Sequence, residues 1–515
     1  MIRNVKRICV IGLDGVGSSS VKNFLSMLAL NNIYNVVSKG YTSSFISLPP
    51  YTPSAWTSIF TGVNPGKHDV YGFFKVFRIG GKFKVSLASS HDIAYPRIFE
   101  MLSMYNFRSV VINIPLVYPV QGLVGLRNFV VVSDWASPRQ FIYPKQYEDT
   151  FREYLVEPPH RWGEAVNVES YVRSVEAFLE RRLGLYYELL EKENYNLFII
   201  VFSELDWLMH RIPDIVAGRR SNLVYKVLSL IDKFVGRACE VCDLVVLVSD
   251  HGFTVSRLFI GVNSILTSKG LITFNYRLNI GKLLRRTRSR EQGTNLPIEK
   301  SKRGSNRLPD QALRNLFTVL SMVAKKFMSQ YALSRLESIV PVSTEVDYSS
   351  SKAFMLEPAS WGLYVKEGYI DVVKRIFGSN RFVKRVLHKE EVFWGPYVQD
   401  APDLILIPRD HVFFDSRIHA EPVYLGYVGE HEPRAIIAFY GDDVLSSAST
   451  DSSAKVSIYD LTPTVLAYMG LPIPSDTDGG PLTEIFSIEL PSAKRKADYL
   501  QRFRMLRKLQ KIRLS

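Results

Sequence analysis

Six short apolar runs recur along the chain between segments of helical character, and they restrict the fold more than any other feature. The runs are Ile8–Leu13, Ser109–Ile114, Leu197–Phe202, Leu244–Val248, Leu404–Ile407 and Ala435–Phe439. None of them alternates with polar residues, which is typical of strands buried on both faces. The apolar spacing of residues 170–193 predicts a helix that leads into the strand at 197. The sequence therefore predicts an α/β fold, with a mainly parallel sheet and crossover helices on both of its faces.

The length of 515 residues is enough for two or three domains, or for one large enzyme domain with an insertion. No apolar run approaches the ~18 residues of a membrane span. The first residues lead straight into the strand at Ile8 instead of forming the apolar core of a secretory signal. These features favour a cytoplasmic protein.

A net charge of +14 could indicate a nucleic-acid-binding protein, but the positions of the charges along the chain argue otherwise. Residues 282–307 hold nine Lys and Arg against two Glu, and residues 494–515 hold nine against one Asp. These two segments account for all of the excess, so the rest of the chain is close to neutral. The sequence therefore predicts no specific nucleic-acid binding by the folded body.

A hydroxyl-rich stretch, Leu48–His68, contains the best candidate nucleophile. Pro49, Pro50 and Pro53 hold the residues up to Thr52 out of helical geometry, and Pro53 suits the first turn of a helix. The hydroxyl of Thr52 is therefore expected at a helix N-terminus, where free backbone N–H groups stabilise a phosphate oxygen. The alternative is that Thr52 merely caps the helix.

Carboxylates and imidazoles follow several of the predicted strands. They are Asp14 after the first strand, Asp206 and His210 after the strand at 197, Asp250 and His251 after the strand at 244, and His431 before the strand at 435. In an open parallel sheet such groups collect at the carboxyl edge. Each signal alone has a simpler explanation, because Asp-Gly is common in turns and Asp-x-x-x-His is common on solvated helix faces. Together, these donors suit Zn²⁺ or Mn²⁺ better than Ca²⁺ or Mg²⁺, with enough ligands for two ions.

The order of these motifs resembles the alkaline phosphatase superfamily. The motifs are Asp14, then Thr52-Pro-x-x-Trp-Thr-x-x-x-Thr-Gly, then Asp206-x-x-x-His, then Asp250-His-Gly, then His431. Within that superfamily the chain is similar to the type I phosphodiesterase/nucleotide pyrophosphatase branch, and most of all to its archaeal and bacterial predicted phosphohydrolase/phosphomutase group. The resemblance extends to Asn113-Ile-Pro-Leu-Val-Tyr-Pro, Ala401-Pro-Asp-Leu, Tyr459-Asp-Leu-Thr-Pro-Thr and Asp478-Gly-Gly.

This resemblance implies two metal ions, with Zn²⁺ favoured over Mn²⁺. It assigns Asp14, Thr52, Asp250 and His251 to one ion and Asp206, His210 and His431 to the other, with Thr52 as the nucleophile. One position departs from the branch. Where the nucleotide pyrophosphatases have an Asn that contacts a phosphate oxygen, this chain has Phe73, which removes the basis for expecting a nucleotide substrate.

The function expected from the resemblance is a metal-dependent phosphodiesterase that works through a phosphothreonine on a small-molecule phosphate ester. A phosphomutase or phosphomonoesterase of the same superfamily is the alternative. A second alternative is a catalytically decayed protein that binds membranes or nucleic acid through its basic segments. Tyr71, Phe73 and Phe74 are expected to form an apolar wall near Thr52, and Lys67 and His68 to assist phosphate binding or complement a helix dipole.

The sequence also predicts how the chain is divided. Residues 1–252 and 400–490 are expected to form the catalytic core, and residues 253–399 an inserted cap that shapes the leaving-group pocket, with a mobile basic loop near 284–309. Residues 491–515 are expected to contain a basic amphipathic helix with Leu500, Phe503, Leu506 and Leu509 on one side. That helix is expected to dock on its own body or on a second subunit, with an anionic membrane surface as the alternative.

Overall fold

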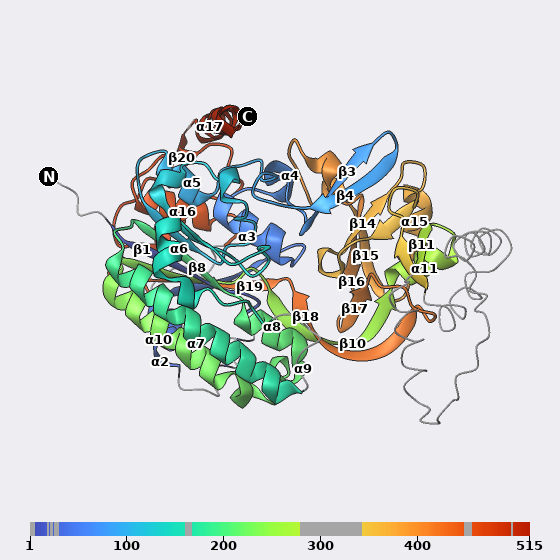
Figure 1. Cartoon of the computed structure of the whole chain (residues 1–515), viewed down its shortest axis with the longest axis horizontal. Coiled ribbons are helices and arrows are strands. Elements are labelled where there is room, and N and C mark those ends of the chain that lie inside the picture. The colour runs from blue at the N-terminus through green and yellow to red at the C-terminus, as the bar shows by residue number, and fades with distance from the viewer. Residues whose placement is uncertain are drawn as a thin grey trace, which may run out of the picture.

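The computed structural model describes residues 6–17, 20, 24, 30–159, 167–278, 342–447, 456–495 and 498–514. Figure 1 shows two bodies joined by two long, curved strands, β10 (Gly252–Gly261) and β18 (Val423–Glu432). The larger body contains the helices α7 and α10 and the central sheet. The smaller one contains β13 to β17 and the helices α11 and α15. We call them the core and the second body.

The core is built on an eight-stranded sheet within the described residues. Its order is β2 (Tyr41–Ile46), β19 (Arg434–Tyr440), β9 (Leu244–Val248), β1 (Ile8–Leu13), β8 (Leu197–Phe202), β5 (Ser109–Ile112), β6 (Phe129–Val132) and β7 (Ile142–Tyr143). The strands β9, β1, β8, β5 and β6 are parallel. The expected α/β fold with a mainly parallel sheet is therefore confirmed.

Helices cover both faces of this sheet. Cys9, Ile11 and Leu13 of β1 pack with α2 (Asn31–Lys39), α7 (Val168–Lys192) and α10 (Tyr225–Val241). Ile8 and Val10, which point the other way, pack with α3 (Thr52–Thr61), α5 (Ile98–Ser103) and α16 (Leu461–Tyr468). A strand with buried side chains on both faces has no polar alternation, which explains the apolar runs in the sequence.

The second body contains a four-stranded antiparallel sheet in the order β13 (Ala353–Met355), β14 (Gly362–Val365), β16 (Leu404–Pro408) and β15 (Val383–His388). Beside it, β17 (Val412–Asp415), β10 and β18 form a three-stranded sheet. The other elements of this body are α11 (Val262–Ser268), α15 (Ile370–Gly378) and the pair β11 (Phe274–Leu278) and β12 (Val342–Val346). A hairpin of β3 (Phe74–Ile79) and β4 (Lys82–Leu87) contributes Val76 and Phe83 to the same apolar cluster.

Two of the predicted strands form where expected but pair differently from the expectation of parallel strands in one sheet. The run Leu404–Ile407 forms β16, which lies in the second body and not in the central sheet, and β19 pairs antiparallel with β9 and β2. The reason is that an apolar run indicates burial, not the partner or the direction of pairing. The division at residues 252 and 400 stays a prediction, and the pairing of β16 and β18 favours moving its second boundary to after residue 432.

The C-terminal helix α17 (Tyr499–Leu514) docks on the core. Tyr499 and Phe503 are buried, and Arg507 donates hydrogen bonds to the carbonyl oxygens of Ser90, His91 and Ile93. These contacts match the docking alternative and give no support to membrane contact. In the part of the chain that the structure describes, no helix combines the length and the hydropathy of a membrane span. The cytoplasmic location stays a prediction, and the basic loop at 284–309 lies outside the described residues.

Candidate active site

The predicted site residues converge at the carboxyl edge of the central sheet. The adjacent strands β8, β1 and β9 end in register there, and the Asp14 N–H donates to the carbonyl oxygen of Phe202 (3.1 Å). Asp14 follows β1, and Asp250 follows β9 after Ser249. The short helix α8 (Glu204–Arg211) begins directly beyond β8 and carries Asp206 and His210, one turn apart. The strand β18 brings in His431.

Thr52 is the first residue of α3, as the proline pattern predicts. Tyr51 before it is extended, and Pro53 lies in the first turn. The Thr52 hydroxyl lies 3.3 Å from Nε2 of His251. By contrast, the hydroxyl of Ser54, two residues further along, donates to the carbonyl oxygen of Tyr51 (3.0 Å), so it is already engaged at the helix start.

One group of donors surrounds Nε2 of His251. Asp250 Oδ2 lies 3.2 Å from it and Asp14 Oδ1 lies 3.6 Å from it. The other oxygen of Asp14 accepts a hydrogen bond from Ser203 (2.9 Å), and the other oxygen of Asp250 accepts one from the N–H of Gly15 (3.2 Å). Each carboxylate is thus fixed by one oxygen and offers the second one to the site.

The second group is formed by Asp206, His210 and His431. Asp206 Oδ1 lies 3.4 Å from Nε2 of His210 and 3.3 Å from Nε2 of His431, and the two Nε2 atoms are 2.9 Å apart. Two imidazole nitrogens cannot both present lone pairs to each other at this distance unless a proton or a cation lies with them. The spacing therefore favours a cation shared by the three side chains.

All three histidines present the same nitrogen to the site. Nδ1 of His210, His251 and His431 lies 2.9, 3.1 and 2.8 Å from the carbonyl oxygens of Gly429, Gly252 and Pro50, respectively. Because a carbonyl oxygen only accepts, each Nδ1 carries the proton and donates it. A hydrogen bond of this kind from Nδ1 fixes the orientation of a metal-binding imidazole and leaves Nε2 as the ligand atom.

The carboxylates of the site also indicate that a cation binds there. Oδ1 of Asp14, Oδ1 of Asp206 and Oδ2 of Asp250 are buried without a hydrogen-bond partner among the described residues. Burial, reinforced by Asp250 and Asp206, raises the pKa of Asp14 well above its ordinary value, and burial raises the pKa of Asp250 to about 7. Three convergent carboxylates in a buried site are costly unless a cation compensates them. The donor set of carboxylate oxygen and imidazole nitrogen fits Zn²⁺ or Mn²⁺.

The electrostatics of the second group favour a positive charge beside Asp206. Burial opposes the charge on Asp206, yet His210 and His431 hold the pKa of this carboxyl at about 2. Burial likewise opposes a charge on His431, but the neighbouring carboxylates, Asp206 foremost, raise the pKa of that imidazole to about 9. A strong preference for positive charge at this point is what a cation site requires.

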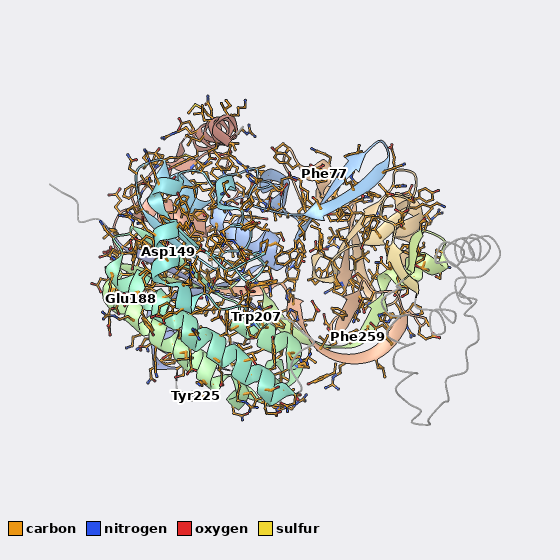
Figure 2. All side chains as sticks on the ribbon, in the orientation of Figure 1. Phe77, Asp149, Glu188, Trp207, Tyr225 and Phe259 are labelled. Carbon is orange, nitrogen blue, oxygen red and sulfur yellow. The ribbon has the colours of Figure 1, made fainter. Side chains whose placement is uncertain are left out.

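A cavity of about 340 Å³ opens over Thr52 and the second group of donors, and we call it the active-site cavity. Aromatic side chains dominate its wall: Tyr51, Phe73, Trp135, Trp207 and Phe413. Figure 2 labels Trp207, which lies near the middle of the molecule. No Lys or Arg among the described residues lines this cavity. The expected apolar wall is therefore present, but of the predicted side chains only Phe73 belongs to it, because Tyr71 packs on Phe393 and Phe74 begins β3.

The two expected phosphate-binding helpers are occupied elsewhere. Lys67 forms an ion pair with Asp478 (2.5 Å). His68 is buried, and its Nε2 lies 3.0 Å from the Ser58 hydroxyl. Burial lowers the pKa of His68 to about 3, so the imidazole is neutral. Neither residue lines the active-site cavity.

Glu357 of the second body is a site residue that the sequence did not indicate. Its Oε1 accepts hydrogen bonds from the Tyr51 hydroxyl (2.5 Å) and from the N–H of Phe73 (3.0 Å). A Cβ at Gly72 would lie 2.0 Å from its other oxygen, so the close approach requires glycine there. Glu357 thereby ties the residue before Thr52, the Phe73 loop and the second body together. No local signal reveals a partner about 300 residues away.

Comparisons with known proteins agree with this geometry. The family model of type I phosphodiesterase/nucleotide pyrophosphatase matches residues 8–431, from the first residue of β1 to the last predicted ligand. A comparison with curated protein sequences finds no match.

Three solved structures illustrate the shared fold. Murine ectonucleotide pyrophosphatase/phosphodiesterase 5 is 12% identical, with a TM-score of 0.51 over 92% of this chain and 98% of that one. Phosphonoacetate hydrolase from Sinorhizobium meliloti 1021 is 13% identical, with a TM-score of 0.52 over 89% and 95%. The alkaline phosphatase PafA is 12% identical, with a TM-score of 0.55 over 95% and 100%.

The family match covers most of the chain and includes every residue of the candidate site. The structural likenesses, at this low identity, show the alkaline phosphatase fold alone. The match supports a hydrolase of phosphate esters, and the chain belongs to the type I phosphodiesterase/nucleotide pyrophosphatase family.

Proposed function

We propose that the protein is a metal-dependent phosphodiesterase in which Thr52 is the nucleophile. The observation that carries the proposal is the convergence of three unpartnered carboxylate oxygens and three Nε2 atoms beside the Thr52 hydroxyl. Asp14, Asp250 and His251, with Thr52, would hold one divalent ion, and Asp206, His210 and His431 the other. When bound, the two ions supply Lewis-acid activation of hydroxyl groups and charge neutralisation at phosphorus.

In the reaction that we propose, the Thr52 hydroxyl attacks phosphorus in line with the leaving group. The P–O bond to the leaving alcohol breaks, and a phosphothreonine forms. Water then attacks the same phosphorus from the opposite side and releases Thr52. The start of α3 contributes free N–H groups that face developing negative charge on the phosphoryl oxygens.

The active-site cavity supports diesters over monoesters. A monoester carries a second negative charge, which enzymes usually neutralise with a guanidinium or an ammonium group. The wall over Thr52 consists mainly of aromatic side chains, with no Lys or Arg among the described lining residues. That wall suits an apolar ester substituent better than an additional charged oxygen.

The test is a metal-depletion experiment on the full chain. Chelation should abolish hydrolysis of bis(4-nitrophenyl) phosphate, and Zn²⁺ or Mn²⁺ should restore it, with a higher kcat/KM than for 4-nitrophenyl phosphate. A preference for the monoester would move the proposal to a phosphatase or a phosphomutase. Activity that persists after complete metal removal would refute the metal-dependent mechanism, and a purified protein that never binds stoichiometric metal would favour the decayed binding protein.

A further inference from the structure

A second, larger cavity lies between the core and the second body, and we call it the interlobe cavity. Its volume is about 650 Å³, within the range of small-molecule sites. The core contributes Ile46, Leu48 and Arg434, and the second body contributes Trp361, Lys384 and Leu387. Each body thus supplies apolar side chains and at least one cation to the same space.

The interlobe cavity meets the active-site cavity at the candidate metal centre. Pro358, Phe413, Glu430 and His431 line both of them. Thr52 lines only the active-site cavity. Among the proposed metal ligands, only His431 of the second group lines the interlobe cavity, so a group bound there reaches the centre beside that second group. In an in-line displacement the leaving group departs opposite the attacking hydroxyl. Because Thr52 is assigned to the first group, the leaving group is expected beside the second.

Cations outnumber carboxyls around the interlobe cavity by four to three. The cations are Lys384, Arg385, Arg409 and Arg434, and the carboxyls are Asp410, Glu430 and Glu432, with the imidazoles of His411 and His431 beside them.

The four cations differ in whether their side chains already form hydrogen bonds or ion pairs. Arg409 donates to the carbonyl oxygen of Arg381 (2.8 Å), and Arg385 lies 3.9 Å from Glu391. Lys384 and Arg434 have neither an ion pair nor a hydrogen bond from their side chains to any residue that the structure describes. One comes from each body, and both are free to bind an anion.

We propose that the interlobe cavity binds the leaving group of the substrate and that this leaving group is an alcohol bearing an anionic substituent, a carboxylate or a phosphate, held by Lys384 and Arg434. The identification of the bound group as a leaving group rests on the proposed function, whereas the binding of an anion in the interlobe cavity does not. The proposal implies a phosphodiester whose two ester substituents differ in charge. One ester substituent lies against the aromatic wall over Thr52, and the charged alcohol lies between the two bodies.

The kinetic test compares two methyl aryl phosphodiesters that differ in the leaving phenol, 4-nitrophenol and 3-carboxy-4-nitrophenol. Lys384→Gln and Arg434→Gln should each lower kcat/KM for the carboxylated ester by roughly tenfold, the usual scale for a charge-assisted hydrogen bond, and leave the neutral ester unchanged. Each effect is the ratio of kcat/KM between variant and wild type on the same ester, so the different pKa values of the two phenols cancel. Arg375→Gln is the matched control. Arg375 is an exposed cation on α15 outside the cavity, with no side-chain partner among the described residues, and its substitution should change kcat/KM for neither ester.

Equal losses on both esters, or no loss on either, would overturn the inference. If the wild-type chain hydrolyses neither ester, the proposed function fails, and calorimetric binding then tests the cavity alone. 3-Carboxy-4-nitrophenol and 4-nitrophenyl phosphate serve as the carboxylate and phosphate probes, and the stronger binder identifies the anionic group. The double variant Lys384→Gln/Arg434→Gln should lose that binding, and binding equal to wild type would overturn the inference.

Discussion

At the scale of single residues, two neighbouring hydroxyls, those of Thr52 and Ser54, differ in their hydrogen-bond partners. Thr52 faces His251, whereas Ser54 closes a hydrogen bond within its own helix start. The family pattern that the sequence resembles assigns the nucleophile to Thr52, and the positions of the two hydroxyls agree with that choice. The chemistry of the seven predicted donors was thus predictable from the sequence, because strand ends and helix starts are local features.

Thr52→Ala should lower kcat by at least about a thousandfold, since it removes the proposed nucleophile. The melting temperature should stay close to that of wild type, because only one small, buried side chain changes. Ser54→Ala is the control from the same turn, and it should retain most of the activity. Steady-state kinetics of the metal-loaded proteins measure both effects. A dead Ser54→Ala variant beside an active Thr52→Ala variant would reverse the assignment.

The groups that hydrogen-bond to the predicted ligands and orient them were less predictable. Ser203 directly follows β8, so its bond to Asp14 could have been expected from position alone. The carbonyl oxygens of Pro50 and Gly429, which orient His431 and His210, have no signature in the sequence because every residue carries such an oxygen. The same holds for the aromatic wall, since Trp135, Trp207 and Phe413 come from three distant segments.

At the scale of elements, the carboxyl group of Glu357 joins the start of α3 to the loop before β3. Burial raises the pKa of Glu357 from 4.5 to about 7. The folded protein therefore prefers the neutral acid while the unfolded chain ionises near pH 4.5, so stability from this group is present at low pH and is lost as the pH rises toward 7. The contribution of Glu357 to the free energy of unfolding therefore depends on pH.

Glu357→Gln removes that titration. The free energy of unfolding of wild type, measured relative to the variant, should fall by roughly 3 kcal/mol between pH 4.5 and pH above 7. Urea unfolding at a series of pH values measures it. Glu367→Gln, an exposed acid of the same body, should show no such trend. A constant difference between wild type and Glu357→Gln at all pH values would contradict the assigned pKa.

The helix α17 offers a second test at this scale, because it presents one buried and one exposed side chain two residues apart. Phe503 is 2% exposed and Met505 is 53% exposed. Phe503→Ala should lower the free energy of unfolding by roughly 3 kcal/mol, the lower end of the usual cost for a buried Phe. Met505→Ala should change it by less than about 0.5 kcal/mol. Equal effects in chemical denaturation would mean that α17 does not dock as described.

At the scale of the whole molecule, the sequence was a good guide to the core and a poor one to the second body. The strands β1, β8 and β9 begin and end where their apolar runs do. By contrast, β16 has the same apolar composition but pairs in another sheet. Which sheet a strand joins depends on contacts between distant segments, and no local pattern encodes them. The two cavities lie between such segments, which is why, of the side chains that line the active-site cavity, the sequence located the predicted ligands and Phe73 but not the rest of the wall.

In the proposed mechanism, the phosphoryl group of the substrate is transferred first to Thr52, which lies between the two sets of predicted metal ligands. The most direct measurement is to mix the metal-loaded protein with excess bis(4-nitrophenyl) phosphate, quench in acid within the first turnover, and map phosphorylated peptides by mass spectrometry. We expect a phosphoryl-containing adduct on Thr52 that is absent from the Thr52→Ala variant and present in the Ser54→Ala variant. Rapid turnover by wild type with no adduct at any quench time, together with full activity of Thr52→Ala, would contradict this mechanism.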